Sequence, residues 1–165
     1  PARSWYLDLS LLEGYWGEER AYHHTAPITN VYALREALRL VAEEGIASRW
    51  KRHERMAGAL KAGVKAMGME MNAPDDYWLP SLNAVRVPAG VEDGQVISRL
   101  LDEYDLEIAG GLGDLSGEIF RIGCMGHSAR PKNVTYLVNT LGSVLEDEGA
   151  DVDAAAGAEA TAEKL

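Results

Sequence analysis

Apolar residues recur three or four positions apart in five stretches of the chain, which is the spacing that places them on one face of a helix. In residues 28–44, for example, Val31, Leu34 and Leu38 share such a face, and a glycine follows the last residue. A proline opens the last of the five stretches, where its fixed φ suits the first turn of a helix. The pattern predicts helices over residues 5–17, 28–44, 48–67, 94–104 and 131–148.

Between these helices the apolar positions alternate with other residues, as they do in a strand with two different faces. The alternation predicts four short strands. The first begins at Met69, and the others cover residues 82–87, 106–109 and 118–124. A glycine-rich segment, residues 110–117, separates the last two. Strands interleaved with helices predict an α/β fold, a two-layer sandwich with helices packed on one face of a single sheet.

The composition is that of a globular protein. A chain of 165 residues with 47% hydrophobic residues forms one domain that buries about two-thirds of its unfolded surface. There is no run of eighteen apolar residues and no basic-then-apolar leader, so we expect neither a membrane span nor a signal peptide, and we expect a cytoplasmic protein. The single cysteine, Cys124, stands in an apolar stretch and is expected to be a buried free thiol.

The net charge of −10 is concentrated at the end of the chain. Residues 146–165 hold seven acids and one base, whereas the preceding residues hold 19 acids and 15 bases. Neither part contains a basic patch, which argues against a nucleic-acid partner. Residues 151–162 are rich in alanine, and no bulky apolar residue follows Val152 within them. We therefore expect residues 149–165 to form an acidic, disordered tail.

Arg121 is the first candidate for chemistry. Alternation in residues 118–124 puts Phe120 and Ile122 on one face of the strand and Arg121 on the other, where a guanidinium needs a carboxylate or solvent. Arginine binds carboxylates in a planar, two-bonded geometry, so a small amino acid or 2-oxo acid would suit it. From spacing alone, an ordinary ion pair with a nearby glutamate is the better interpretation.

The second candidate is the polar segment of residues 22–27, which precedes a predicted helix. Hydroxyls from Tyr22 and Thr25 could donate to a phosphate near the N-terminal end of that helix. A zinc site at His23 and His24 is a weaker interpretation, since neighbouring histidines point in different directions and no further Cys or His cluster has ligand spacing. A capped loop with exposed histidines is the third.

A glycine-dense turn is the last candidate segment. Gly110 and Gly111 permit positive φ and close approach of the backbone, but no lysine-bearing helix follows as in a phosphate-binding loop. A structural turn and a site-lining turn are equally good interpretations.

Three segments, Tyr-His-His-Thr-Ala-Pro at 22–27, Gly-Gly-Leu-Gly at 110–113 and Phe-Arg-Ile-Gly at 120–123, resemble the signature of the class V pyridoxal-phosphate-dependent aminotransferases. The nearest group is the alanine/serine:glyoxylate aminotransferases. The likeness also includes Trp-Tyr-Leu-Asp at 5–8 and Tyr-Trp-Gly at 15–17, and it runs from about residue 3 to residue 146. It implies the small C-terminal domain of a type I pyridoxal-phosphate transferase, with a mainly antiparallel sheet.

The resemblance implies a division of the chain and a set of roles. Residues 1–27 would end the large-domain, active-site segment, and residues 28–148 would form the small domain. Arg121 matches the arginine that binds the substrate carboxylate, and Tyr22 and Thr25 match positions that reach the cofactor phosphate of a neighbouring subunit in a homodimer. His23, His24, Gly110 and Gly111 would line the active site.

The resemblance also shows what this stretch of sequence lacks. The family's Schiff-base lysine lies upstream of the segment that matches Pro1, and none of the chain's five lysines matches it. We therefore expect no catalytic residue and no metal site here, and an isolated chain that is inactive. Pyridoxal 5'-phosphate would bind only together with a large-domain polypeptide or an intact subunit.

The implied function is transfer of an amino group from alanine or serine to glyoxylate or a similar 2-oxo acid. The alternative is an inactive remnant that serves as a small-carboxylate binding module or a protein-interaction module.

Overall fold

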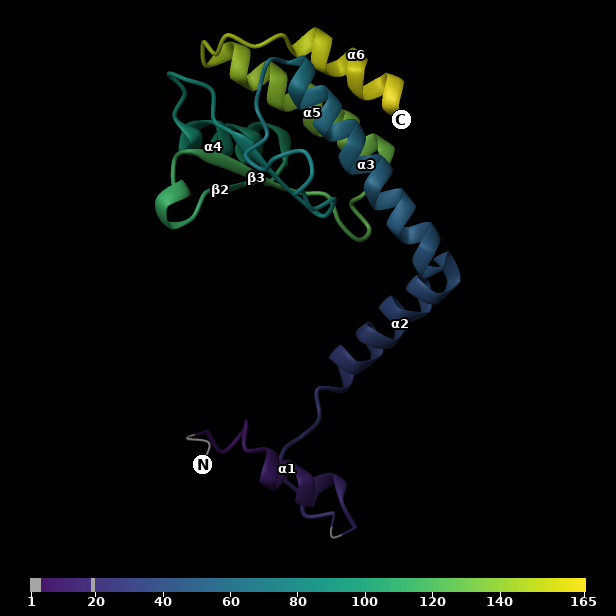
Figure 1. Ribbon diagram of the computed structural model, residues 1–165. Coiled ribbons are helices and arrows are strands. Elements are labelled where there is room, and N and C mark those ends of the chain that lie inside the picture. Colours follow the sequence, from purple (N-terminus) through teal and green to yellow (C-terminus); the bar gives the residue numbers. More distant parts are fainter. Residues whose placement is uncertain (1–3, 19) are drawn as a thin grey trace. The chain divides into compact units, whose positions relative to one another are not determined.

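The computed structural model describes residues 4–18 and 20–165 and divides into two compact units, Pro1–Glu44 and Gly45–Leu165 (Figure 1). Residues 1–3 and 19, which belong to the predicted 1–27 segment, lie outside the described residues. The boundary falls at Gly45 rather than at residue 28. Gly45 has a φ of 79°, a conformation that interrupts a helix and is readily adopted by glycine.

The N-terminal unit contains two helices, α1 (Leu9–Trp16) and α2 (Ile28–Glu44). Helix α1 begins four residues later than predicted, because the Asp8 side chain accepts a hydrogen bond from the Ser10 backbone N–H at 3.0 Å and caps the helix there. The hydrogen bonds from Ser10 lower the pKa of the Asp8 carboxyl. The predicted bounds of α2 are confirmed.

The C-terminal unit contains the sheet, with β1 (Leu82–Arg86), β2 (Ala109–Gly110) and β3 (Ile119–Gly123) in the order β1-β3-β2. Both pairings are antiparallel, and β3 is the central strand. The segment at Met69 was predicted to be a strand, but Met71 makes only an isolated bridge to Val85. Of the predicted strand over residues 106–109 only Ala109 lies in a strand, β2, which continues to Gly110.

The larger helices of this unit are α3 (Ile46–Ala66), α4 (Asp93–Tyr104) and α5 (Pro131–Asp147), with a short 3-10 helix, η1 (Gly113–Leu115). They pack over one face of the sheet, which confirms the predicted two-layer α/β sandwich (Figure 1). Their apolar faces meet the inward side chains of β1 and β3 in one core. The largest fully buried side chains include Phe120, Met56, Leu60, Leu100, Ile122 and Leu141.

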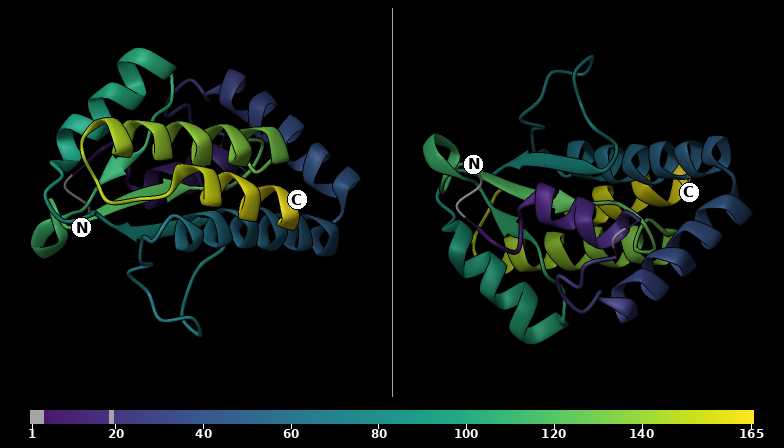
Figure 2. Two further views of the ribbon diagram at one scale, coloured as in Figure 1. Left: turned by 90° about the horizontal axis from the view of Figure 1, so that it is seen from above. Right: turned by 90° about the horizontal axis from the view of Figure 1, so that it is seen from below.

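The predicted disordered tail is wrong. Residues 154–164 form helix α6 (Ala154–Lys164), which lies alongside α3 and α5 (Figure 2). The Asp153 side chain caps it by accepting a hydrogen bond from the Ala156 N–H at 2.8 Å, and Gly157 and Thr161 are buried. The sequence argument looked for bulky apolar residues, whereas this helix packs through small ones.

Glycines at the helix crossings make that packing possible. A Cβ atom on Gly63 of α3 would meet the Thr161 hydroxyl oxygen and would lie 3.0 Å from both Gly157 O and Val138 Cγ1. A Cβ on Gly142 of α5 would lie 2.7 Å from Ala154 Cβ. The backbones of α3, α5 and α6 can therefore approach closely, and the area that they bury orders the end of the chain.

Within residues 4–18 and 20–165, no helix has both the length and the apolar character needed to cross a membrane.

Two glycines of α3 give a matched test of this packing. Gly58→Ala places its methyl group where no atom lies within 4 Å, so we expect a gain of about 0.5–1 kcal/mol in the free energy of unfolding from helix propensity alone. Gly63→Ala makes the same change at the crossing with α6 and should destabilise the chain by about 1–3 kcal/mol. Urea unfolding of both variants measures the difference. Equal stability of the two variants would show that α6 does not pack on α3.

Candidate functional site

Arg121 occupies the middle of the central strand, where it faces Ala84 of β1 on one side and Ala109 of β2 on the other. Pairing on both sides fixes its backbone, and Phe120 and Ile122 are buried on either side of it in sequence. The predicted alternation therefore holds for these three residues. Ile119 shares the Arg121 face by alternation and is nevertheless buried, so that face is partly covered.

The guanidinium of Arg121 is held at one nitrogen and open at the other two. Its Nε donates a hydrogen bond of 2.6 Å to the backbone carbonyl of Gly110, and the side chain is half-buried. Within the described part of the chain, no carboxylate lies within ion-pair distance of it. The ion pair with a nearby glutamate that spacing alone favours is therefore not formed there, and the two terminal nitrogens remain available to a ligand.

The glycine turn is structural and also serves Arg121. A Cβ atom on Gly111 would overlap the backbone carbonyl of Leu115, and Gly113 has a φ of 58°. This tight turn sets where the Gly110 carbonyl stands against the arginine. The structural interpretation of the turn therefore holds, and the lining of an active site by Gly110 and Gly111 stays a prediction.

The hydroxyls of Tyr22 and Thr25 meet. Tyr22 Oη lies 2.9 Å from Thr25 Oγ1, and both residues are exposed in the segment that leads into α2. One hydroxyl donates to the other at this distance, and both are free to donate to one oxygen-rich ligand once that ligand replaces their mutual bond. This hydroxyl pair belongs to the N-terminal unit, whereas Arg121 belongs to the C-terminal unit.

The histidines between these hydroxyls are not the exposed pair of the loop interpretation. His23 is buried and its ring stacks on Trp5, with ring centroids 4.1 Å apart and an angle of 16° between the ring planes. His24 is half-buried, and its Nδ1 lies 2.7 Å from Nδ1 of His23. In the described residues, no group of three or more His, Cys, Asp and Glu side chains could hold a metal ion.

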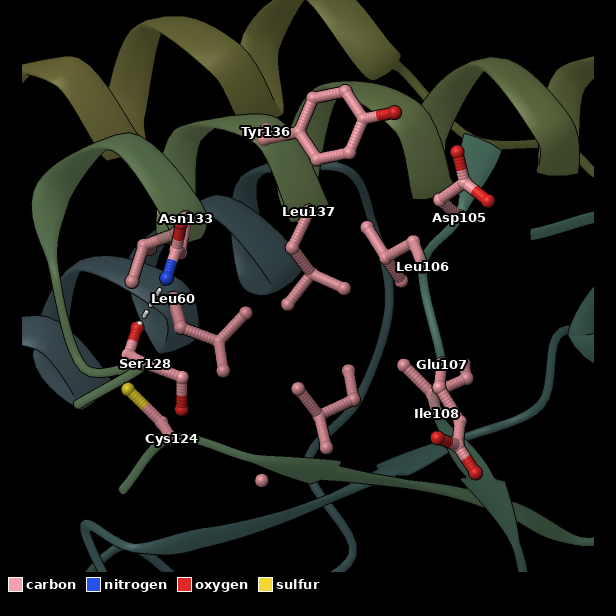
Figure 3. A pocket seen from close by; sticks show the side chains of 13 residues that line it. Leu60, Asp105, Leu106, Glu107, Ile108, Cys124, Ser128, Asn133, Tyr136 and Leu137 are labelled. Carbon is pink, nitrogen blue, oxygen red and sulfur yellow. Dashed lines mark hydrogen bonds between the residues drawn. The ribbon is translucent and has the colours of Figure 1, made fainter. Parts of the chain in front are cut away.

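A pocket of about 290 Å³ opens in the C-terminal unit, and sequence reasoning did not predict it (Figure 3). Its floor consists of buried residues of several elements, and Asp105, Glu107 and Asn133 stand exposed at its edge. Cys124 is a buried free cysteine, as expected, and its burial raises the pKa of the thiol. Arg121 does not line this pocket. The buried floor residues are Leu60, Ile108, Ile122, Cys124, Val134 and Leu137.

The turn after β3 is tied to α3 by two residues. His53 Nε2 accepts a hydrogen bond of 2.9 Å from the Gly126 N–H, and Arg52 donates to the carbonyls of Gly126 and Ala129 at 3.0 and 2.8 Å. Both side chains are half-buried. The contacts join residues more than 70 positions apart, and no local pattern indicates them.

Known proteins are similar to this chain along most of its length. No family model matches the chain. The (S)-ureidoglycine--glyoxylate transaminase of Bacillus subtilis is 44% identical over 154 residues, which are 93% of this chain and 37% of that protein. The alanine--glyoxylate aminotransferase of Felis catus is 35% identical over 147 residues, or 87% of this chain and 36% of that protein.

This chain is homologous to the C-terminal portion of the glyoxylate aminotransferases. The resemblance seen in the sequence motifs is thereby confirmed. The chain spans less than two-fifths of the length of these curated relatives, at 37% and 36%.

Solved structures agree with this assignment. The chain matches the ureidoglycine-glyoxylate aminotransferase of Bacillus subtilis with a TM-score of 0.93 and 41% identity, over 99% of this chain and 42% of that one. It matches the alanine--glyoxylate aminotransferase of Nostoc sp. with a TM-score of 0.82 and 46% identity, over 87% and 38% of the two chains. The pyridoxamine-pyruvate aminotransferase of Mesorhizobium loti gives a TM-score of 0.84 and 30% identity, over 92% and 39%.

The glycine turn beside Arg121 yields a stability prediction. Gly111→Ala forces a methyl group against the Leu115 carbonyl, a backbone atom that cannot rotate away, so we expect a loss of about 2 kcal/mol or more in the free energy of unfolding. Gly94→Ala, in α4 with no atom within 4 Å of the new methyl group, is the control and should not destabilise the chain. Denaturant unfolding checks both. A Gly111→Ala chain as stable as the wild type would refute the tight turn.

Proposed function

We propose that the chain is the C-terminal part of a pyridoxal-phosphate-dependent transaminase and that it binds the carboxylate of a small amino acid or 2-oxo acid. The observation that carries this proposal is Arg121, whose Nε is fixed on the Gly110 carbonyl while no carboxylate of the described chain pairs with it. A planar guanidinium held in this way is pre-oriented for a two-bonded contact with an external carboxylate.

The residues present also fit the phosphate of the cofactor. The Tyr22 and Thr25 hydroxyls are exposed and 2.9 Å apart, so a phosphate can replace their mutual hydrogen bond and accept from both, as the resemblance implies for a neighbouring subunit. Helix α2 begins three residues later, at Ile28. When bound, pyridoxal phosphate supplies the electron sink for amino-group transfer, and the protein supplies orientation and charge.

The lysine that such chemistry requires is proposed to come from the rest of the polypeptide. A Schiff-base lysine is activated by desolvation, whereas every lysine of this chain is exposed or half-buried. Lys61 and Lys65 pair with Asp75 at 2.7 and 3.0 Å, and these cations lower the pKa of the Asp75 carboxyl to about 2. None of the five is suited to the role, which supports an inactive isolated chain.

For the substrates, we propose glyoxylate or a similar 2-oxo acid as acceptor and alanine or serine as amino donor. The names of both curated relatives include glyoxylate. A ureidoglycine donor is the second candidate, because the relative that bears this name has the higher identity, 44% against 35%. The assembled enzyme is proposed to be a cytoplasmic homodimer whose large domain lies outside this stretch of sequence.

The competing proposal is a non-catalytic module. An arginine with open terminal nitrogens could serve as a small-carboxylate sensor, and the exposed Tyr22 segment could dock into a partner protein.

Arg121 can be tested directly in the enzyme assembled with its large domain. Arg121→Ala should lower kcat/KM for both the amino donor and the 2-oxo acid by about 100-fold, equivalent to about 3 kcal/mol, because charge-assisted bonds to the carboxylate are lost. Arg121→Lys should recover only part of this, since an ammonium group cannot form the fork. The matched control is Arg86→Ala, which removes an exposed arginine from the adjacent strand. Unchanged kinetics in Arg121→Ala would remove Arg121 from the substrate site.

Reconstitution distinguishes the enzyme from the module. The chain alone should give no visible absorbance of lysine-bound pyridoxal phosphate, and addition of the large-domain polypeptide should produce it at about one cofactor per site. A band from the chain alone would contradict the missing-lysine argument. No band with the large domain, together with retained carboxylate binding in calorimetry, would favour the module.

A further inference from the structure

We propose that His23 is a positioning residue that holds the Tyr22 and Thr25 hydroxyls ready for a phosphate monoester. This inference rests on the proposed function, in which those hydroxyls contact the cofactor phosphate. It goes beyond that function because the sequence assigns His23 only to the lining of the site, whereas the structure makes it the buried anchor of the segment.

His23 is buried, whereas its neighbours in the sequence are exposed or half-buried. Its exposed fraction is 6%, whereas that of Tyr22 is 73%. The imidazole lies nearly parallel to the Trp5 ring at 4.1 Å, and its Nε2 is 3.0 Å from the Trp5 backbone carbonyl. One side chain thus makes a stacking contact and a hydrogen bond to a segment 18 residues earlier in the chain.

The contact with Trp5 fixes the tautomer of a neutral His23. A carbonyl oxygen only accepts, so Nε2 of His23 carries the proton that is donated to Trp5 O. The Nδ1 atom of a neutral His23 is then an acceptor, and it accepts a hydrogen bond of 2.7 Å from the Nδ1–H of His24. Both nitrogens of the buried ring are satisfied, and the two histidines are locked to each other.

His24 also connects His23 to the tyrosines around the hydroxyl pair. The centroid of the His24 ring lies 4.8 Å from that of the Tyr6 ring and 5.9 Å from that of the Tyr15 ring. The rings of Tyr15 and Tyr22 are nearly perpendicular, with centroids 6.1 Å apart, and the Tyr22 hydroxyl lies against Thr25. The exposed hydroxyls of Tyr22 and Thr25 therefore belong to a segment whose conformation depends on the contacts of the buried His23.

Fixing the segment before binding lowers the entropy lost when the ligand arrives. Without the His23 anchor, residues 22–25 must be ordered at the moment of binding, and the phosphate loses part of its contribution to affinity. The contribution of the pyridoxal ring, which these hydroxyls do not contact in the proposed arrangement, should be unaffected. A comparison of pyridoxal phosphate with pyridoxal isolates that difference.

The test uses the apo form of the enzyme assembled with its large domain, titrated with pyridoxal phosphate and with pyridoxal. His23→Ala should weaken pyridoxal phosphate binding about tenfold and leave pyridoxal binding within about twofold. His23→Gln keeps an N–H donor and should recover most of the loss. Tyr32→Phe, which removes an exposed hydroxyl from α2, is the control and should change neither affinity.

A double-mutant cycle that combines His23→Ala with removal of the two hydroxyls completes the test. In a Tyr22→Phe/Thr25→Val background, His23→Ala should cause no further loss of pyridoxal phosphate affinity, since it acts through those hydroxyls. Equal losses for both ligands, or additive losses in the cycle, would overturn the positioning role while the phosphate site stands. An unchanged preference for pyridoxal phosphate over pyridoxal in the Tyr22→Phe/Thr25→Val variant would overturn the phosphate site itself.

Discussion

The antiparallel pairing of β3 between β1 and β2 is the constraint on which the C-terminal unit depends. A one-residue shift of its register would move every side chain of a strand to the opposite face. Phe120 and Ile122 hold the strand to the helical layer, and the same register turns Arg121 away from that layer. The position of the candidate carboxylate anchor is therefore a consequence of core packing.

The surroundings of β3 extend this rigidity to the site. The Gly111 turn fixes the Gly110 carbonyl on Arg121 Nε, and His53 and Arg52 hold the turn that follows the strand. Helix α6 closes the far side of the helical layer through glycine contacts with α3 and α5. A guanidinium supported in this way loses little side-chain freedom when a carboxylate binds, which favours binding of a small ligand.

The N-terminal unit is ordered by interactions of a different kind. Helices α1 and α2 bury no residue completely, so the order of the Tyr22 segment comes from aromatic stacking and from hydrogen bonds of His23 and His24. Polar hydroxyls are thereby presented on a rigid base without a large core. Such a base suits recognition of a charged group better than recognition of an apolar one.

Periodicity in the sequence determined helices α1 to α5, the alternation in β3 and the burial of Cys124, because these depend on each residue's near neighbours. The motif resemblance determined the kinship with glyoxylate aminotransferases before any fold was known. Only the tertiary structure decided that Met71 makes a bridge and not a strand, that residues 154–164 fold, and that Arg121 is fixed on Gly110. These outcomes depend on contacts between segments far apart in the chain. Close glycine packing in particular leaves no hydrophobic pattern, since its energy comes from how near two backbones can approach.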